Sequence, residues 1–177
     1  MGEIKSTLDL VMERTRNLTL SAEEKQAQKQ IEIVNRIKGL VQKFQDGLLT
    51  QNQIKIDYES LKKDSNLSND SLLVNEILIR LDPAQNTQNL LEVLEEFCRL
   101  DTATIRSIIN EYRDAYSQAA QKRTAQLKED LAQKHSITGS AVVPHLDADE
   151  DWQREAQDLR RKFEDRLSQA KDQLTAG

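Results

Sequence analysis

The closing stretch of the chain, residues 152–174, carries a regular helical pattern of apolar and small residues. These are separated in turn by four, three, four, four, three and four positions: Trp152, Ala156, Leu159, Phe163, Leu167, Ala170 and Leu174. The spacing places them on one stripe of a nearly straight helix, and the opposite face is almost wholly charged or amide. Because such a helix cannot bury its stripe alone, it must pack against another helix. The pattern therefore predicts a helical packing protein.

The amino-acid composition favours long helices with short connections. Only five Gly and two Pro occur among 177 residues, and 31% of the residues are charged. This polarity is typical of thin helical bundles, in which the surface is large relative to the core. The formal net charge of -5 does not favour phosphate backbones, and 4% aromatic residues argue against base-stacking platforms.

The cellular setting expected from the sequence is the cytoplasm. No segment approaches the roughly 20 apolar residues that span a bilayer, so we expect no membrane partner. The N-terminus lacks an apolar run after positive charge, which argues against a signal peptide. The single cysteine, Cys98, is compatible with a reducing compartment.

Residues 1–100 are expected to form an N-terminal helical bundle. Two capping boxes, Ser21 with Glu24 and Thr50 with Gln53, mark helix starts, and Gly47 suits the left-handed position after a helix. The most apolar window, residues 72–81, could be mistaken for a strand, but no second strand-like run exists to pair with it. Apolar periodicity and turn signals together predict helices at residues 3–16, 22–46, 51–63, 72–81 and 90–97.

Residues 101–177 are expected to form a long antiparallel helical hairpin. Its arms are residues 101–134, capped by Asp101, and residues 148–174, and an irregular loop at residues 135–147 joins them. Past Tyr116 the apolar stripe of the first arm thins to alanine, which leaves room for another helix. The fold predicted is therefore all-α, an N-terminal bundle followed by this hairpin.

Two short patches carry a resemblance to a known group of proteins. One is the opening run Met1-Gly2-Glu3-Ile4-Lys5-Ser6 with the charged residues at 13–16, and the other is Ile137-Thr138-Gly139-Ser140-Ala141-Val142-Val143-Pro144, followed by acidic residues and Trp152. Both are similar to landmarks of a family of uncharacterised, all-helical bacterial proteins. The patches cover a small part of the chain. The resemblance implies a bacterial protein of unknown function and assigns no role to any residue.

Each candidate for a chemical site has a simpler structural explanation. The acidic run 147–151 has the spacing of half a calcium loop but carries Trp152 where the turn needs glycine, so it is better explained as an acidic helix start. His135 and His145 do not have the spacing of a metal pair on one helix face, and Cys98 lies among apolar neighbours. Gly2 and Ser6 match the short myristoylation pattern by chance. We expect no catalytic residue, no metal and no cofactor.

The function predicted is a non-catalytic helical protein–protein interaction or scaffold module, which includes self-association through helix stripes. A ribosome- or RNA-associated helical factor is the alternative, and an enzyme of unrecognised type is the second alternative. No small-molecule substrate is evident. The apolar loop residues 142–144 either dock a partner or fold back over the end of the bundle, and the second is favoured because monomers rarely expose apolar tips. The residues predicted to bind a partner are Val142, Val143, Pro144, Trp152, Leu159 and Phe163.

Overall fold

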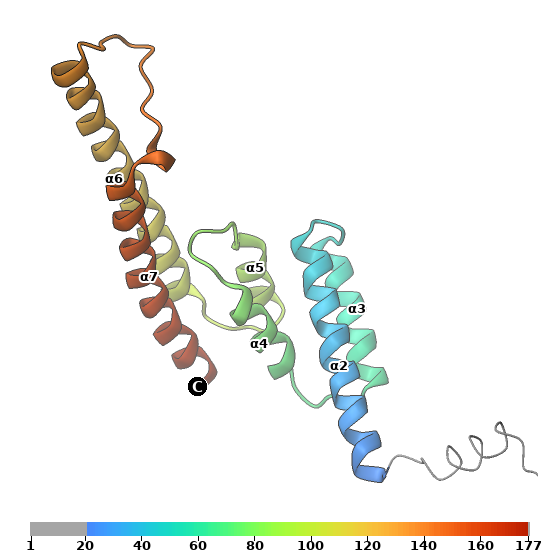
Figure 1. Ribbon diagram of the computed structural model, residues 1–177. Coiled ribbons are helices and arrows are strands. Elements are labelled where there is room, and N and C mark those ends of the chain that lie inside the picture. The colour runs from blue at the N-terminus through green and yellow to red at the C-terminus, as the bar shows by residue number, and fades with distance from the viewer. Residues whose placement is uncertain (1–20, 177) are drawn as a thin grey trace, which may run out of the picture.

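The computed structural model describes residues 21–176, and within this range the regular structure is entirely helical (Figure 1). The helices are α2 (Ala22–Gln45), α3 (Gln51–Asp64), α4 (Ser71–Arg80), α5 (Gln88–Glu96), α6 (Ala103–His135) and α7 (Glu150–Ala176), with a short 3-10 helix η1 (Leu146–Ala148). The predicted all-α fold is therefore confirmed. The helix expected at residues 3–16 and the myristoylation pattern at Gly2 and Ser6 lie outside the described residues.

The helix starts predicted from capping boxes are confirmed in atomic detail. Ser21 Oγ accepts a hydrogen bond from the Glu24 amide at 3.1 Å, and a Glu24 carboxylate oxygen accepts from the Ser21 amide at 2.7 Å. Thr50 and Gln53 repeat the arrangement at the start of α3. Gly47 ends α2 with a φ of 72°, which a residue with a side chain adopts only at a cost. These signals act within one helical turn, so they depend little on the rest of the fold.

Replacing Thr50 by alanine is expected to lower the free energy of unfolding by about 1 kcal/mol, because it removes the hydroxyl that accepts from the Gln53 amide at 3.3 Å and donates to Gln53 Oε1 at 3.0 Å. Urea unfolding followed by far-UV circular dichroism measures the change. Thr50→Ser keeps the hydroxyl and should retain most of the stability. Equal losses for the two variants would show that the methyl group, rather than the cap, carries the effect.

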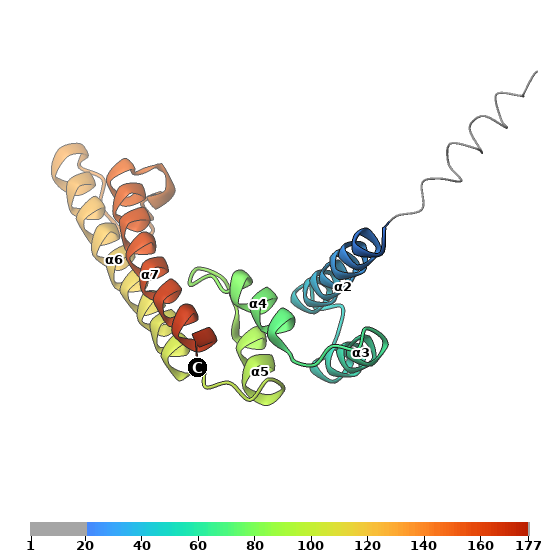
Figure 2. The same cartoon turned by 90° about the horizontal axis from the view of Figure 1, so that it is seen from below.

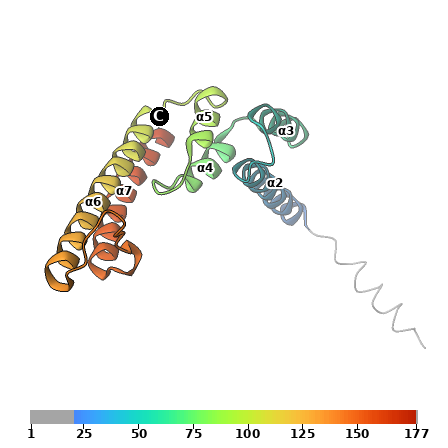
Figure 3. The same cartoon turned by 90° about the horizontal axis from the view of Figure 1, so that it is seen from above.

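Apart from Trp152, the buried apolar residues form one cluster that draws on every helix from α2 to α7. The window 72–81, predicted as a buried helix, is α4, and its residues Leu73 and Ile77 are fully enclosed. Helices α4 and α5 lie between the α2–α3 pair on one side and the hairpin on the other (Figures 1, 2 and 3). The middle of the described structure is therefore built by the two shortest of its α-helices.

Helices α6 and α7 pack side by side as the antiparallel hairpin that the sequence predicts (Figure 2). The first arm begins one residue later than expected, because Thr102 is the capping position and Asp101 instead accepts a hydrogen bond from the Ala103 amide at 3.0 Å. The second arm begins at Glu150 rather than at residue 148, since residues 146–148 form η1. The domain boundary expected near residue 100 falls in the short connection between α5 and α6.

Candidate interaction surface

A row of four aromatic rings follows the contact between α6 and α7. Ring centroids are 5.2 Å apart for Trp152 and Tyr116, 5.9 Å for Tyr116 and Tyr112, and 5.6 Å for Tyr112 and Phe163. Trp152 and Phe163 are only 3% and 5% exposed, whereas Tyr116 remains 38% exposed. Of the residues predicted to bind a partner, Trp152 and Phe163 are thus covered by α6.

Leu159, another residue predicted to bind a partner, is half-buried and packs against the main apolar cluster. The apolar side of α7 is therefore largely used within the chain. A partner role for Trp152, Leu159 and Phe163 stays a prediction, and it would require α7 to separate from its neighbours. The surface that is open without such a change lies elsewhere on the hairpin.

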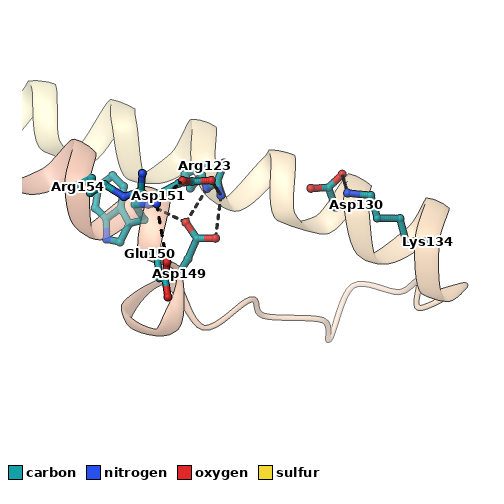
Figure 4. A network of polar contacts seen from close by, with 8 residues as sticks. Arg123, Asp130, Lys134, Asp149, Glu150, Asp151 and Arg154 are labelled. Carbon is teal, nitrogen blue, oxygen red and sulfur yellow. Dashed lines mark hydrogen bonds and ion pairs between the residues drawn. The ribbon is translucent and has the colours of Figure 1, made fainter.

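The start of α7 is fixed to the middle of α6 by an ion pair between Arg123 and Asp149 (Figure 4). Arg123 donates two hydrogen bonds to the carboxylate, from Nε at 2.9 Å and from Nη2 at 2.8 Å. The same carboxylate accepts from the Trp152 amide at 2.7 Å and so caps the helix. We call this arrangement of Arg123, Asp149 and the Trp152 amide the clasp. Asp149, the middle residue of the acidic run 147–151, thus caps the start of α7.

The clasp should respond to acid. The hydrogen bonds from Arg123, followed by that from the Trp152 amide, hold the pKa of Asp149 below its ordinary value. A carboxyl whose pKa is lower in the folded state stabilises the fold above its ordinary pKa, and this stabilisation is lost as the pH falls through the lowered value. In the wild type we expect Trp152 to become exposed only in strong acid, when Asp149 is protonated. In Asp149→Ala the carboxylate is absent, so Trp152 should already be exposed at neutral pH.

Trp152 is the only tryptophan, so its fluorescence emission reports on the clasp directly. A red-shifted emission of Asp149→Ala at neutral pH is the expected result. Asp158→Ala is the matched control, because Asp158 is exposed on the same helix and reaches Arg161 only at 3.8 Å. An emission maximum in Asp149→Ala equal to that of the control would contradict a role for the clasp in seating Trp152.

The loop between the two arms exposes two large apolar side chains, Ile137 and, more strongly, Val143. Val142 and Pro144 are half-buried, but Val143 is 82% exposed. Asp147, three residues after Pro144, is also exposed. Residues 142–147, here called the tip segment, therefore present an apolar side chain followed by a carboxylate where the loop runs back beside α6 toward Asp149 (Figure 4).

A groove of about 560 Å³ lies between the hairpin and the segment that connects α4 to α5. We call it the hairpin groove. Tyr112, Tyr116 and Pro83 give it apolar walls, and Arg113 and Arg160 carry positive charge beside them. The complete lining consists of Pro83, Ala84, Tyr112, Arg113, Tyr116, Ala156, Gln157 and Arg160. None of these lining residues is acidic.

Basic side chains of the hairpin hold the connecting segment in place beside the groove. Arg160 pairs with Asp82 at 3.0 Å, and Lys171 Nζ donates to the Leu81 carbonyl oxygen at 2.8 Å. Arg113 Nη2 donates to the Gln85 carbonyl oxygen at 3.2 Å, and no carboxylate of the described residues pairs with Arg113. The guanidinium of Arg113 thus keeps most of its donors for a ligand. Sequence reasoning missed this groove, because its two sides are far apart in the chain.

A second cluster gathers the titratable side chains nearest to Cys98. Asp70 accepts hydrogen bonds from Tyr58 Oη at 3.2 Å and from Lys62 Nζ at 2.7 Å. Burial, and then the negative charge of Asp70, raise the pKa of the Cys98 thiol to about 11. The thiol is therefore protonated at neutral pH.

Among the residues that the structure describes, no group of three or more His, Cys, Asp and Glu side chains is placed to hold a metal ion, and His135 and His145 are both exposed. Within the same residues, no helix has the length and apolar character needed to cross a bilayer. Comparison of the chain with protein-family models, curated proteins and solved structures yields no match.

Proposed function

We propose that this chain is a non-catalytic helical protein–protein interaction module that works in the bacterial cytoplasm and binds its partner in the hairpin groove. The observation that carries the proposal is the groove itself, an apolar hollow with basic side chains that the described part of the chain leaves open. The two largest apolar side chains of α7, Trp152 and Phe163, are by contrast used internally, since they pack on α6. Open apolar surface of this kind in a folded chain is typical of interaction sites.

The chemistry of the groove favours one kind of partner segment. Tyrosine rings and Pro83 favour an apolar side chain, and the fork of Arg113 favours a carboxylate close to it. Rigid aromatic side chains and arginine are the residue types that contribute most to binding at protein interfaces. The expected partner is therefore a protein segment in which an apolar residue stands near an acidic one.

The charge arrangement of the hairpin supports a protein partner over RNA. Six of its arginines already lie beside carboxylates: Arg106, Arg123, Arg154, Arg160, Arg161 and Arg166. The hairpin also carries more acidic than basic residues. A phosphate backbone is bound by unpaired basic side chains on one face, and this pattern does not favour such binding.

Site-specific photo-crosslinking in living cells tests this proposal. A photoreactive amino acid at Gln157, which lines the groove, should form protein adducts, whereas the same group at the exposed Arg161 on α7 should not. The variant Ala84→Arg fills the groove from its other side and should abolish the Gln157 adducts. Absence of protein adducts at Gln157, adducts that ribonuclease removes, or adducts unaffected by Ala84→Arg would each overturn the proposal.

A further inference from the structure

We infer that the segment bound in the hairpin groove is the tip segment, residues 142–147, of a second copy of this chain, so that two hairpins join in a reciprocal dimer. The inference rests on the proposed function, because it names the occupant of the same groove. It also accounts for the exposure of Val143, which no contact within the described chain explains.

The tip segment has the chemistry that the groove favours. Val143 projects an almost fully exposed apolar side chain, and the exposed carboxylate of Asp147 follows four residues later. Pro144, between them, fixes its own φ and restricts Val143 to extended backbone, so the segment loses little conformational entropy on binding. An extended apolar segment with a nearby acidic side chain is thus available on every copy of the chain.

The groove offers a matching contact to each part of this segment. The rings of Tyr112 and Tyr116 with Pro83 can cover the side chain of Val143. Arg113, whose described hydrogen bond goes only to the Gln85 carbonyl, can pair with the carboxylate of Asp147. The lining contains no acidic residue that would repel this carboxylate.

The hairpin geometry allows the contact to form twice. The loop that joins α6 to α7 and the segment that joins α4 to α5 lie on the same side of the hairpin (Figures 1 and 3). Along α6, Tyr116 at the groove is separated by about 10 Å, at 1.5 Å per residue, from Arg123, which pairs with Asp149 just after the tip segment. Two hairpins turned head to tail about a twofold axis would therefore each place a tip segment over the groove of the other. Such an isologous contact closes as a dimer.

Sedimentation velocity of the purified full chain over a range of concentrations tests the dimer. The wild type should shift from monomer to dimer as the concentration rises. Val143→Glu and Ala84→Arg should each weaken self-association by about tenfold or more, because a charge would be pressed against apolar walls or would fill the groove. Both residues are exposed in the single chain, so neither change should disturb folding, which circular dichroism verifies. Ile56→Glu, at an exposed apolar residue on α3, should leave the dimer unchanged.

Mixing the two variants gives the decisive measurement. A mixed dimer of Val143→Glu with Ala84→Arg retains one intact contact, because the unaltered tip of the Ala84→Arg copy meets the unaltered groove of the Val143→Glu copy. In the other contact, the introduced Glu faces the introduced Arg. The mixture should therefore dimerise at concentrations at which either variant alone is monomeric.

Two outcomes would overturn the inference. A wild type that stays monomeric at every concentration has no reciprocal contact, and a mixture that stays monomeric shows that tip and groove do not meet. Neither outcome touches the proposed function by itself, since Gln157 adducts with an unlike protein would still support the groove as a binding site. Adducts between two copies of the chain at Gln157 would support both proposals.

Discussion

Trp152→Ala is expected to lower the free energy of unfolding by about 3–5 kcal/mol, because it removes a large buried ring from the contact between α6 and α7. The ring is 3% exposed and meets Tyr116 edge to face. The backbone amide of residue 152, which donates to Asp149, remains in the variant, so the loss reports on the ring. Urea unfolding followed by far-UV circular dichroism is the suitable measurement, because the variant lacks the fluorescent residue.

Two variants make the Trp152 result specific. Trp152→Phe keeps an aromatic ring over Tyr116 and should lose clearly less stability than the alanine variant. Val143→Ala truncates an apolar side chain that is exposed, and it should change the free energy of unfolding by less than about 0.5 kcal/mol. A loss below about 1 kcal/mol for Trp152→Ala would mean that the ring is not buried against α6 in solution, and the stripe of α7 would then be open to a partner.

Local features of this fold could be predicted from the sequence, because the interactions that determine them span one or two helical turns. The caps at Ser21 and Thr50, the left-handed Gly47 and the periodicity of α7 are of this kind. The start of α6 was misplaced by one residue, since Asp101 and Thr102 are both acceptable caps and only the backbone geometry distinguishes them. The helix that covers the apolar stripe of α7 was also predictable, because α6 is the long helix that a single loop joins to α7.

The candidate site could not be predicted in the same way. Arg160 meets Asp82 across 78 positions of sequence, and the groove exists only because this contact and those of Lys171 and Arg113 hold the connecting segment beside the hairpin. Periodicity and capping contain no information on such long-range pairs. The loop residues Val142, Val143 and Pro144 were recognised as candidates from the sequence. Which of them is exposed depends on the path of the whole loop, and in the structure Val143 is exposed while Val142 and Pro144 are half-buried.

The ion pair between Glu76 and Arg80 lies within α4 and also helps to pack α4 against α2. Arg80 Nε donates to Glu76 at 2.7 Å, and the rest of the guanidinium donates to Gln42, Gln45 and the Lys38 carbonyl oxygen, all on the last turns of α2. The side chains of Arg80 and Glu76 are only 19% and 10% exposed. The pair therefore joins α4 to α2 in a place that water reaches poorly.

Arg80→Met is expected to lower the free energy of unfolding by about 3 kcal/mol, because it leaves the Glu76 carboxylate poorly exposed and without its cation. The double variant Arg80→Met/Glu76→Leu removes both charges and should recover most of that loss, since an apolar pair of similar volume needs no compensation. Arg36→Met is the matched control. Arg36 also pairs with a glutamate one turn earlier at 2.7 Å, but these side chains are 57% and 59% exposed, so the change should cost less than about 1 kcal/mol. Equal losses at Arg80 and Arg36 in urea unfolding would show that burial contributes nothing to the pair, and the double variant would then bring no recovery.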